Sequence, residues 1–124
     1  MIVETPRGRF GVHFAGRGEP GVLALHPLAL SGAVWNGAGD GAAGRLGLMG
    51  LDARGHGNSP WDGKPFTVED MADDAAAVIQ ATAPGPVGVI GLSMGGSTAL
   101  VLAARSQVNP VPVEMPNQML PSPA

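Results

Sequence analysis

Three apolar runs recur along the chain and are separated by longer segments of mixed composition. They span residues 22–26, 46–51 and 87–92, the first of them ending in His26. Continuous apolar runs of this length are typical of strands that are covered on both faces, as they are in a parallel sheet. We therefore expect three buried strands at these positions.

The amino-terminal residues carry a different strand signal. Residues 2–4 and 9–15 are short runs that contain β-type residues, and Pro6 and Gly8 separate them. Residues 16–21, with the sequence GRGEPG, have the composition of a turn. The pattern predicts a hairpin-like pair of strands ahead of the first buried strand.

The clearest helical pattern follows Thr67. Thr67 and Asp70 have the spacing of a capping box with Asp in place of Glu, and residues 68–79 keep an apolar stripe with helical periodicity. Two prolines within residues 84–86 end this helix. Residues 95–105 are small and apolar, and they predict a second helix directly after the third buried strand.

The alternation of strands and helices predicts an α/β fold with a mostly parallel, doubly wound sheet. Residues 37–44 occupy the place of a further helix, although each glycine there costs about 1 kcal/mol relative to alanine. Residues 107–124 hold five prolines, one charged residue and no periodicity. We therefore expect one domain over residues 1–105 and a disordered, proline-rich tail over residues 106–124.

Composition and charge narrow the classes of function. The chain has 124 residues, of which 44% are hydrophobic and 14% charged, and this balance favours a folded domain over a disordered one. The formal net charge is −3, and the seven Lys and Arg residues form no basic stripe. A protein that binds nucleic acid needs such a stripe to neutralise phosphates, so we expect no nucleic-acid partner.

Several kinds of site and location are also disfavoured. The chain has no cysteine, which excludes disulfides, thiolate metal sites and a cysteine nucleophile. The three histidines lack the spacing of metal ligands, and no motif in the sequence predicts a bound cofactor. Neither a signal peptide nor a membrane span is visible. The sequence therefore predicts a cytoplasmic protein without metal or cofactor.

The strongest candidate for chemistry is Ser93, in the sequence Gly91-Leu92-Ser93-Met94-Gly95 between a buried strand and a helix. A sharp turn at this place strains the serine backbone and pushes its hydroxyl away from the sheet. Side chains at Gly91 and Gly95 would collide with such a turn. The start of the helix directs N–H groups, including that of Met94, toward developing negative charge. The pattern thus predicts Ser93 as a nucleophile that attacks a carbonyl group.

Two further segments follow the ends of buried strands. His26-Pro27-Leu28 comes after the first strand, and because Pro27 has no N–H, the second oxyanion donor would be the N–H of Leu28. Residues 52–59, DARGHGNS, come after the second strand. Glycines permit a tight loop there, and Asp52 or Arg54 can bond loop backbone, which favours a structural role for this loop.

With these features in order, residues 2–105 resemble the α/β-hydrolase superfamily. The resemblance rests on the paired first strands, the HPL segment with Trp35 downstream, the D-x-R-G-H-G-x-S loop and GLSMGG. Within that superfamily the chain is most similar to small ester and lactone hydrolases such as the 3-oxoadipate enol-lactonase-like group. The resemblance implies a serine hydrolase whose substrate is a small uncharged ester or lactone.

The resemblance also shows what the sequence lacks. In this family the triad acid and histidine follow the serine, yet no histidine follows His56, and Glu114 is the only carboxylate side chain after Ser93. His26 and His56 are the candidates for a substitute base. The family's sheet also continues with three more strands. We therefore expect a hydrolase domain without its carboxyl-terminal strands, cut short by truncation, frameshift or a misplaced gene end, and inactive or weakly active.

Two other readings compete with a serine hydrolase. GLSMGGST matches a phosphate-binding loop except that Ser97 stands where the lysine should be, which makes a degenerate nucleotide binder an alternative. The other alternative is a non-catalytic hydrolase fragment. Without the later strands, residues 87–92 would form an open apolar edge, through which the chain could associate with itself.

Overall fold

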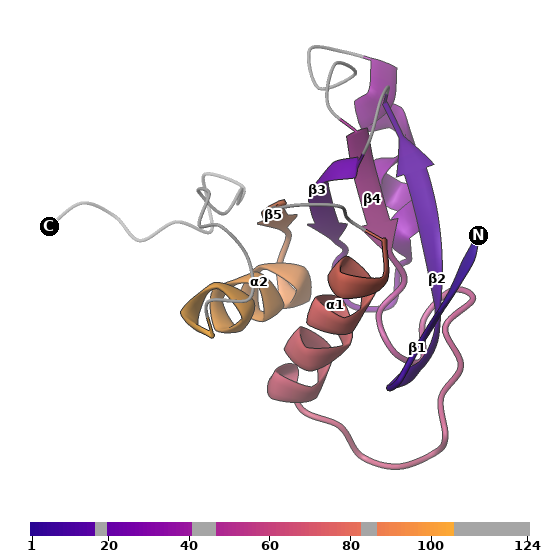
Figure 1. Ribbon diagram of the computed structural model, residues 1–124, viewed down its shortest axis with the longest axis vertical. Coiled ribbons are helices and arrows are strands. Elements are labelled where there is room, and N and C mark those ends of the chain that lie inside the picture. Colours follow the sequence, from indigo (N-terminus) through magenta and orange to yellow (C-terminus); the bar gives the residue numbers. More distant parts are fainter. Residues whose placement is uncertain (17–19, 41–46, 83–86, 106–124) are drawn as a thin grey trace, which may run out of the picture.

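The computed structural model describes residues 1–16, 20–40, 47–82 and 87–105 (Figure 1). The tail at residues 106–124, expected to be disordered, lies outside the described residues, as do residues 41–46 and 84–86. Over the described ranges, the elements are five strands, one 3-10 helix and two α-helices: β1 (Ile2–Thr5), β2 (Gly8–Ala15), β3 (Pro20–Leu25), η1 (Gly32–Asp40), β4 (Gly47–Leu51), α1 (Val68–Thr82), β5 (Gly88–Gly91) and α2 (Met94–Ala104).

The five strands form one mixed sheet with the order β1-β2-β4-β3-β5. Strand β3 pairs in parallel with β4 and with β5, whereas β2 pairs antiparallel with both β1 and β4. The predicted α/β sheet is confirmed, and the predicted hairpin is the β1–β2 pair. Leu25 lies opposite both Leu51 and Gly91, so the three parallel strands end at the same edge of the sheet. Segments that follow these strands therefore meet there.

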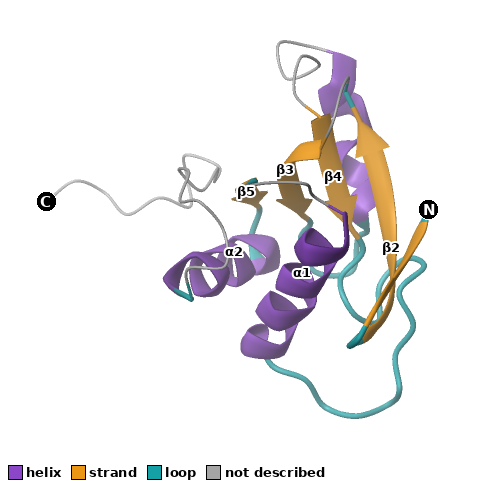
Figure 2. Ribbon diagram, viewed as in Figure 1, coloured by secondary structure: helices purple, strands orange, loops and turns teal. Residues whose placement is uncertain are grey.

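Helices cover the sheet on both faces (Figure 2). Helices α1 and α2 pack on each other against one face, where the Thr82 hydroxyl of α1 lies 3.3 Å from the Met49 sulfur. The next residue of β4 is Gly50, whose Cα faces the other side of the sheet. There its backbone lies against the backbone of Gly32 at the start of η1. Both sides of β4 are thus buried, which explains why its sequence is apolar without alternation.

The helix predicted for residues 37–44 differs from the helix that the structure contains there. The sequence places a helix over residues 37–44, but the structure has a 3-10 helix that begins five residues earlier, at Gly32, and is described to Asp40. Its position depends on a backbone contact, because a Cβ atom on either Gly32 or Gly50 would collide with the carbonyl of the other. Local propensity contains no signal for such a contact between distant residues.

Helix α1 begins at the predicted capping box. The Thr67 N–H donates to the Asp70 carboxylate at 2.9 Å, and the Asp70 N–H donates to the Thr67 hydroxyl at 3.1 Å. The Thr67 N–H and the Thr67 hydroxyl both donate to the Asp70 carboxylate, and these two bonds lower the pKa of Asp70. Among the described helices, none is both long and apolar enough to cross a membrane.

Candidate active site

Ser93 lies at the turn between β5 and α2, at the edge where the three parallel strands end. Only Leu92 and Ser93 separate the strand from the helix. Ser93 has φ 54° and ψ −116°, a conformation that residues with a Cβ atom rarely adopt. Its side chain is exposed and makes no capping hydrogen bond to α2. The turn therefore presents the hydroxyl outward, free of the helix backbone.

The glycines on either side of Ser93 allow close packing of the backbone. A Cβ atom at Gly91 would collide with the carbonyl of Gly95, and one at Gly95 would collide with the carbonyl of Leu25. The Leu92 N–H also donates to the Leu25 carbonyl at 3.2 Å, which ties the turn to β3. Residues with side chains at Gly91 and Gly95 would separate the turn from the sheet.

The first N–H groups of α2 point toward the Ser93 side of the turn. Met94 is the first residue of the helix, so its N–H has no partner within the helix. The aligned peptide dipoles make this end of α2 partly positive. An oxygen that gains negative charge next to Ser93 would be stabilised there.

The segment after β3 places Leu28 in a turn at the same edge of the sheet. The Leu30 N–H donates to the Pro27 carbonyl at 3.3 Å, and Ala29, inside the turn, has a positive φ of 66°. Leu28 is 67% exposed. The structure thus gives both predicted oxyanion donors, Leu28 and Met94, positions in segments that follow the ends of parallel strands.

His26 is a buried part of the loop scaffold in this structure. Its Nδ1 lies 2.7 Å from the Pro27 carbonyl, and its Nε2 accepts a hydrogen bond from the Ala53 N–H at 2.9 Å. These partners assign a neutral ring with the proton on Nδ1. Burial lowers the pKa of His26, which agrees with a neutral ring. Both nitrogens are engaged, so His26 as placed has none to offer Ser93.

His56 lies beside His26, with the two ring centroids 5.1 Å apart. Its Nδ1 donates to the Arg54 carbonyl at 3.0 Å, and its ring is half-buried in the loop after β4. Within the described part of the chain, no hydrogen bond joins Ser93 to either histidine. The described residues also bring together no group of three His, Asp or Glu side chains that could hold a metal ion.

Several hydrogen-bond donors surround one buried carboxylate, that of Asp52, and the sequence did not predict this cluster as a whole. Asp52 is completely buried, and it accepts hydrogen bonds from the Gly32 N–H at 2.7 Å, the Asn58 N–H at 2.9 Å and His13 Nε2 at 3.0 Å. Burial acts to raise the pKa of Asp52, but these donors outweigh it and lower the pKa. The sequence indicated a loop-bonding role for Asp52, whereas it gave His13 no role.

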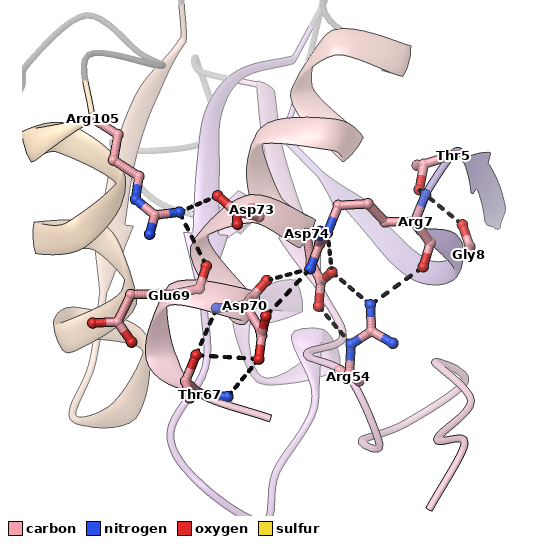
Figure 3. A network of polar contacts seen from close by, with 10 residues as sticks. All are labelled: Thr5, Arg7, Gly8, Arg54, Thr67, Glu69, Asp70, Asp73, Asp74 and Arg105. Atoms are coloured by element: carbon pink, nitrogen blue, oxygen red, sulfur yellow. Dashed lines mark hydrogen bonds and ion pairs between the residues drawn. The ribbon is translucent and has the colours of Figure 1, made fainter. Parts of the chain in front are cut away.

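A second buried carboxylate joins the loop after β4 to α1. Asp74 accepts hydrogen bonds from Arg54 at 2.7 and 2.9 Å and from Arg7 at 2.8 Å (Figure 3). Arg54 also donates to the backbone carbonyl of Arg7 at 3.3 Å, so it binds both a loop backbone, as the sequence suggested, and a carboxylate of a helix. Asp74 lies between the buried residues Met71 and Val78 on the helix, and this interruption of the apolar stripe was the available signal.

Comparison with known proteins identifies the fold family. The model of the family described as alpha/beta hydrolase fold matches residues 20–114. The chain belongs to this family. It is 32% identical over 104 residues to the lipase LipV of Mycobacterium tuberculosis, an alignment that covers 84% of this chain and 38% of the lipase. The expected superfamily is thereby confirmed.

Solved structures of hydrolases have the same fold. An esterase from Thermogutta terrifontis matches with a TM-score of 0.75 and 27% identity, over 89% of this chain and 42% of that chain. The N-acyl homoserine lactonase AidH matches with a TM-score of 0.76 and 29% identity, over 87% of this chain and 41% of that chain. The chain therefore spans about two fifths of the length of these alpha/beta hydrolases.

Proposed function

We propose that Ser93 is the nucleophile of a serine hydrolase that acts on small uncharged esters or lactones. The observation that carries this proposal is the positive φ of Ser93 at an exposed turn between strand and helix, packed tightly through Gly91 and Gly95. The substrate class is supported by the relatives, which include a lipase, an esterase and a lactonase.

The reaction follows from the groups at the edge of the sheet. The Ser93 oxygen bonds to the carbonyl carbon, a base takes the hydroxyl proton, and the carbonyl electron pair moves onto its oxygen. The N–H groups of Met94 and Leu28 donate to this oxyanion. When the carbonyl double bond of this tetrahedral intermediate forms again, the bond to the alkoxide breaks, and the alkoxide takes up the proton that the base holds. A water molecule then attacks the ester of acyl-Ser93, which releases the carboxylic acid and restores the Ser93 hydroxyl. A lactone follows the same steps, with its alkoxide remaining attached to the acyl group.

The base is the part of this scheme that the described residues do not supply. His26 uses both ring nitrogens in the loop, and His56 donates from Nδ1 to Arg54. A triad that lacks a member keeps only the modest rate that binding and the oxyanion hole supply. We therefore expect slow reaction of Ser93 in these 124 residues, and a non-catalytic hydrolase fragment stays the alternative.

The geometry disfavours the nucleotide-binding alternative. A phosphate-binding loop needs several residues with free N–H groups between the strand and the helix. Here α2 begins at Met94, so Gly96, Ser97 and Thr98 are already helical. The turn is too short to surround a phosphate group. Cytoplasmic location and self-association through the edge at β5 stay predictions from the sequence.

Fluorophosphonate labelling of the purified chain, with mass spectrometry to locate the adduct, tests the proposed function. We expect an adduct on Ser93 that is lost in Ser93→Ala and retained in Ser97→Ala, which removes an exposed serine one helical turn away. Folded protein that acquires no adduct would instead support the non-catalytic alternative. An adduct that persists in Ser93→Ala would show that another residue is the nucleophile.

A further inference from the structure

The segment that carries Leu28 is fixed at both of its ends by two consecutive residues after β4. At one end, the Ala53 N–H donates to His26 Nε2 at 2.9 Å. At the other end, the Gly32 N–H donates to Asp52 Oδ1 at 2.7 Å. Residues 26–31 belong to no strand or helix, so ladder hydrogen bonds do not hold them. Their position depends on these anchors and on the packing of Gly32 against Gly50.

The same segment stores backbone strain beside Leu28. Ala29 has a positive φ of 66°, which costs an L-residue free energy and persists only where the surroundings enforce it. Because Ala29 directly follows Leu28, relaxation of its φ would rotate the peptide groups of the turn. The direction of the Leu28 N–H therefore depends on what prevents this relaxation.

The Asp52 carboxylate is enclosed by hydrogen-bond donors and by glycine backbone. Asn58 N–H donates to Oδ2, and His13 Nε2 lies 3.0 and 3.1 Å from the two oxygens. A Cβ atom at Gly11 or at Gly57 would collide with this carboxylate, so glycine at both positions leaves room for it. The site joins β2, the loop after β4 and the start of η1 at one buried group.

We propose that Asp52, oriented by His13, is a positioning residue for the oxyanion donor at Leu28. Through the Gly32 N–H, Asp52 holds the end of the segment that His26 does not hold, and it thereby keeps the Leu28 N–H directed toward the oxygen that forms beside Ser93. The proposal rests on the proposed function of Ser93 and adds a residue that touches neither substrate nor nucleophile.

Asp52→Asn separates this role from general stability when two quantities are measured on the full chain. Native-state hydrogen exchange reports the protection of the Gly32 amide relative to amides of β3, and it needs no activity. The rate of Ser93 phosphonylation by a fluorophosphonate reports the oxyanion site. Asp62→Asn is the matched control, because Asp62 is an exposed carboxylate on the same loop.

We expect exchange at Gly32 to accelerate at least about tenfold more than exchange in β3, and phosphonylation to slow by at least about tenfold. Asp62→Asn should change neither quantity. Exchange that rises equally in Gly32 and β3, or that does not rise, would overturn the proposal. So would an unchanged rate of phosphonylation in a variant whose Gly32 amide is released.

A second variant covers the case in which Asp52→Asn does not fold. His13→Val removes the His13 donor but leaves Asp52 in place, and the His13 side chain is already partly exposed. We expect the same two changes with smaller size. If wild-type protein is not labelled at Ser93, the proposed function fails, whereas the exchange data still decide whether Asp52 fixes the Leu28 segment.

Discussion

Two residues other than glycine have positive φ in the described part of the chain, and they lie on the two sides of the proposed oxyanion site. Ser93 has φ 54°, and Ala29, next to the proposed donor Leu28, has φ 66°. A left-handed backbone costs an L-residue about 1–2 kcal/mol. Residues in such conformations concentrate at functional sites, where the surrounding structure enforces them. The strain at Ser93 therefore predicts a stability effect that is separate from chemistry.

Ser93→Gly should raise the free energy of unfolding by about 1 kcal/mol, because glycine adopts this conformation without a Cβ clash. The gain is smaller than the full strain, since glycine also increases the entropy of the unfolded chain. Ser93→Ala keeps the Cβ atom and should change stability little. Urea denaturation of the three proteins measures the difference. Equal stability of the Gly and Ala variants would show that the turn is not strained.

The site residues differ in how far the sequence could predict them. Ser93, Gly91 and Gly95 lie within one short pattern, so the local sequence was enough to predict the tight turn that they form. The cluster at Asp52 brings together His13 and Gly32, which are distant from it in sequence. A single sequence contains no periodicity that reports such a meeting. The contact exists only once β2, β4 and η1 are in place.

At the scale of elements, Asp74 joins α1 to two loops at once. Arg54 donates to it from two nitrogens, and Arg7 donates from the turn between β1 and β2 (Figure 3). The Arg54 guanidinium also lies 5.6 Å from the centre of the Phe10 ring. These contacts fix the amino-terminal half of α1 relative to the hairpin and to the loop that holds His26.

Asp74→Asn should lower the free energy of unfolding by about 2–3 kcal/mol, because it leaves two arginines beside a buried group without charge. The value is below that of a fully buried pair, since Arg7 is partly exposed. Asp73→Asn, one residue earlier, is the control: its pair with Arg105 is more exposed and should contribute less than about 1 kcal/mol. Thermal or urea unfolding distinguishes the two, and equal losses would contradict the assignment.

The elements themselves were largely predictable, with one physical exception. Strands β3, β4 and β5 are buried on both faces, so their apolar runs identified them to within two residues at each end. Helix α1 has both a cap and a stripe. At the start of the 3-10 helix η1, the Ser31 hydroxyl accepts a hydrogen bond from the Ala33 N–H at 3.3 Å, as a capping residue does. The glycines of η1 nevertheless suppress helical propensity, and its start depends on the contact between Gly32 and Gly50.

The free energy of unfolding of the molecule depends on pH through two buried groups at the carboxyl ends of the parallel strands. His26 is neutral and its pKa lies below 6.5, whereas Asp52 is ionised and its pKa lies below 3.8. Unfolding exposes both groups and returns each pKa to its ordinary value. Below pH 6.5 the unfolded chain therefore binds a proton at His26 that the folded chain does not bind.

Stability should therefore decrease as the pH falls below 6.5, with a slope that a single proton limits to about 1.4 kcal/mol per pH unit. The Asp52 contribution is present above pH 3.8 and is lost as the pH falls further. Urea unfolding between pH 8 and pH 5 measures the His26 contribution. His26→Gln should flatten the slope in this range. An equal slope in wild type and variant would assign the effect to another group.

The order of strands in the sheet has a consequence for how the chain is made. Strand β3 lies between β4 and β5, and both follow it in the sequence. During synthesis from the amino terminus, β3 therefore leaves the ribosome before either of its partners. An apolar segment that is exposed without its strand partners is prone to aggregate, and pairing between segments that are distant in sequence is slow. We expect the nascent chain to need a chaperone until Gly91 has emerged and β3 can pair on both sides.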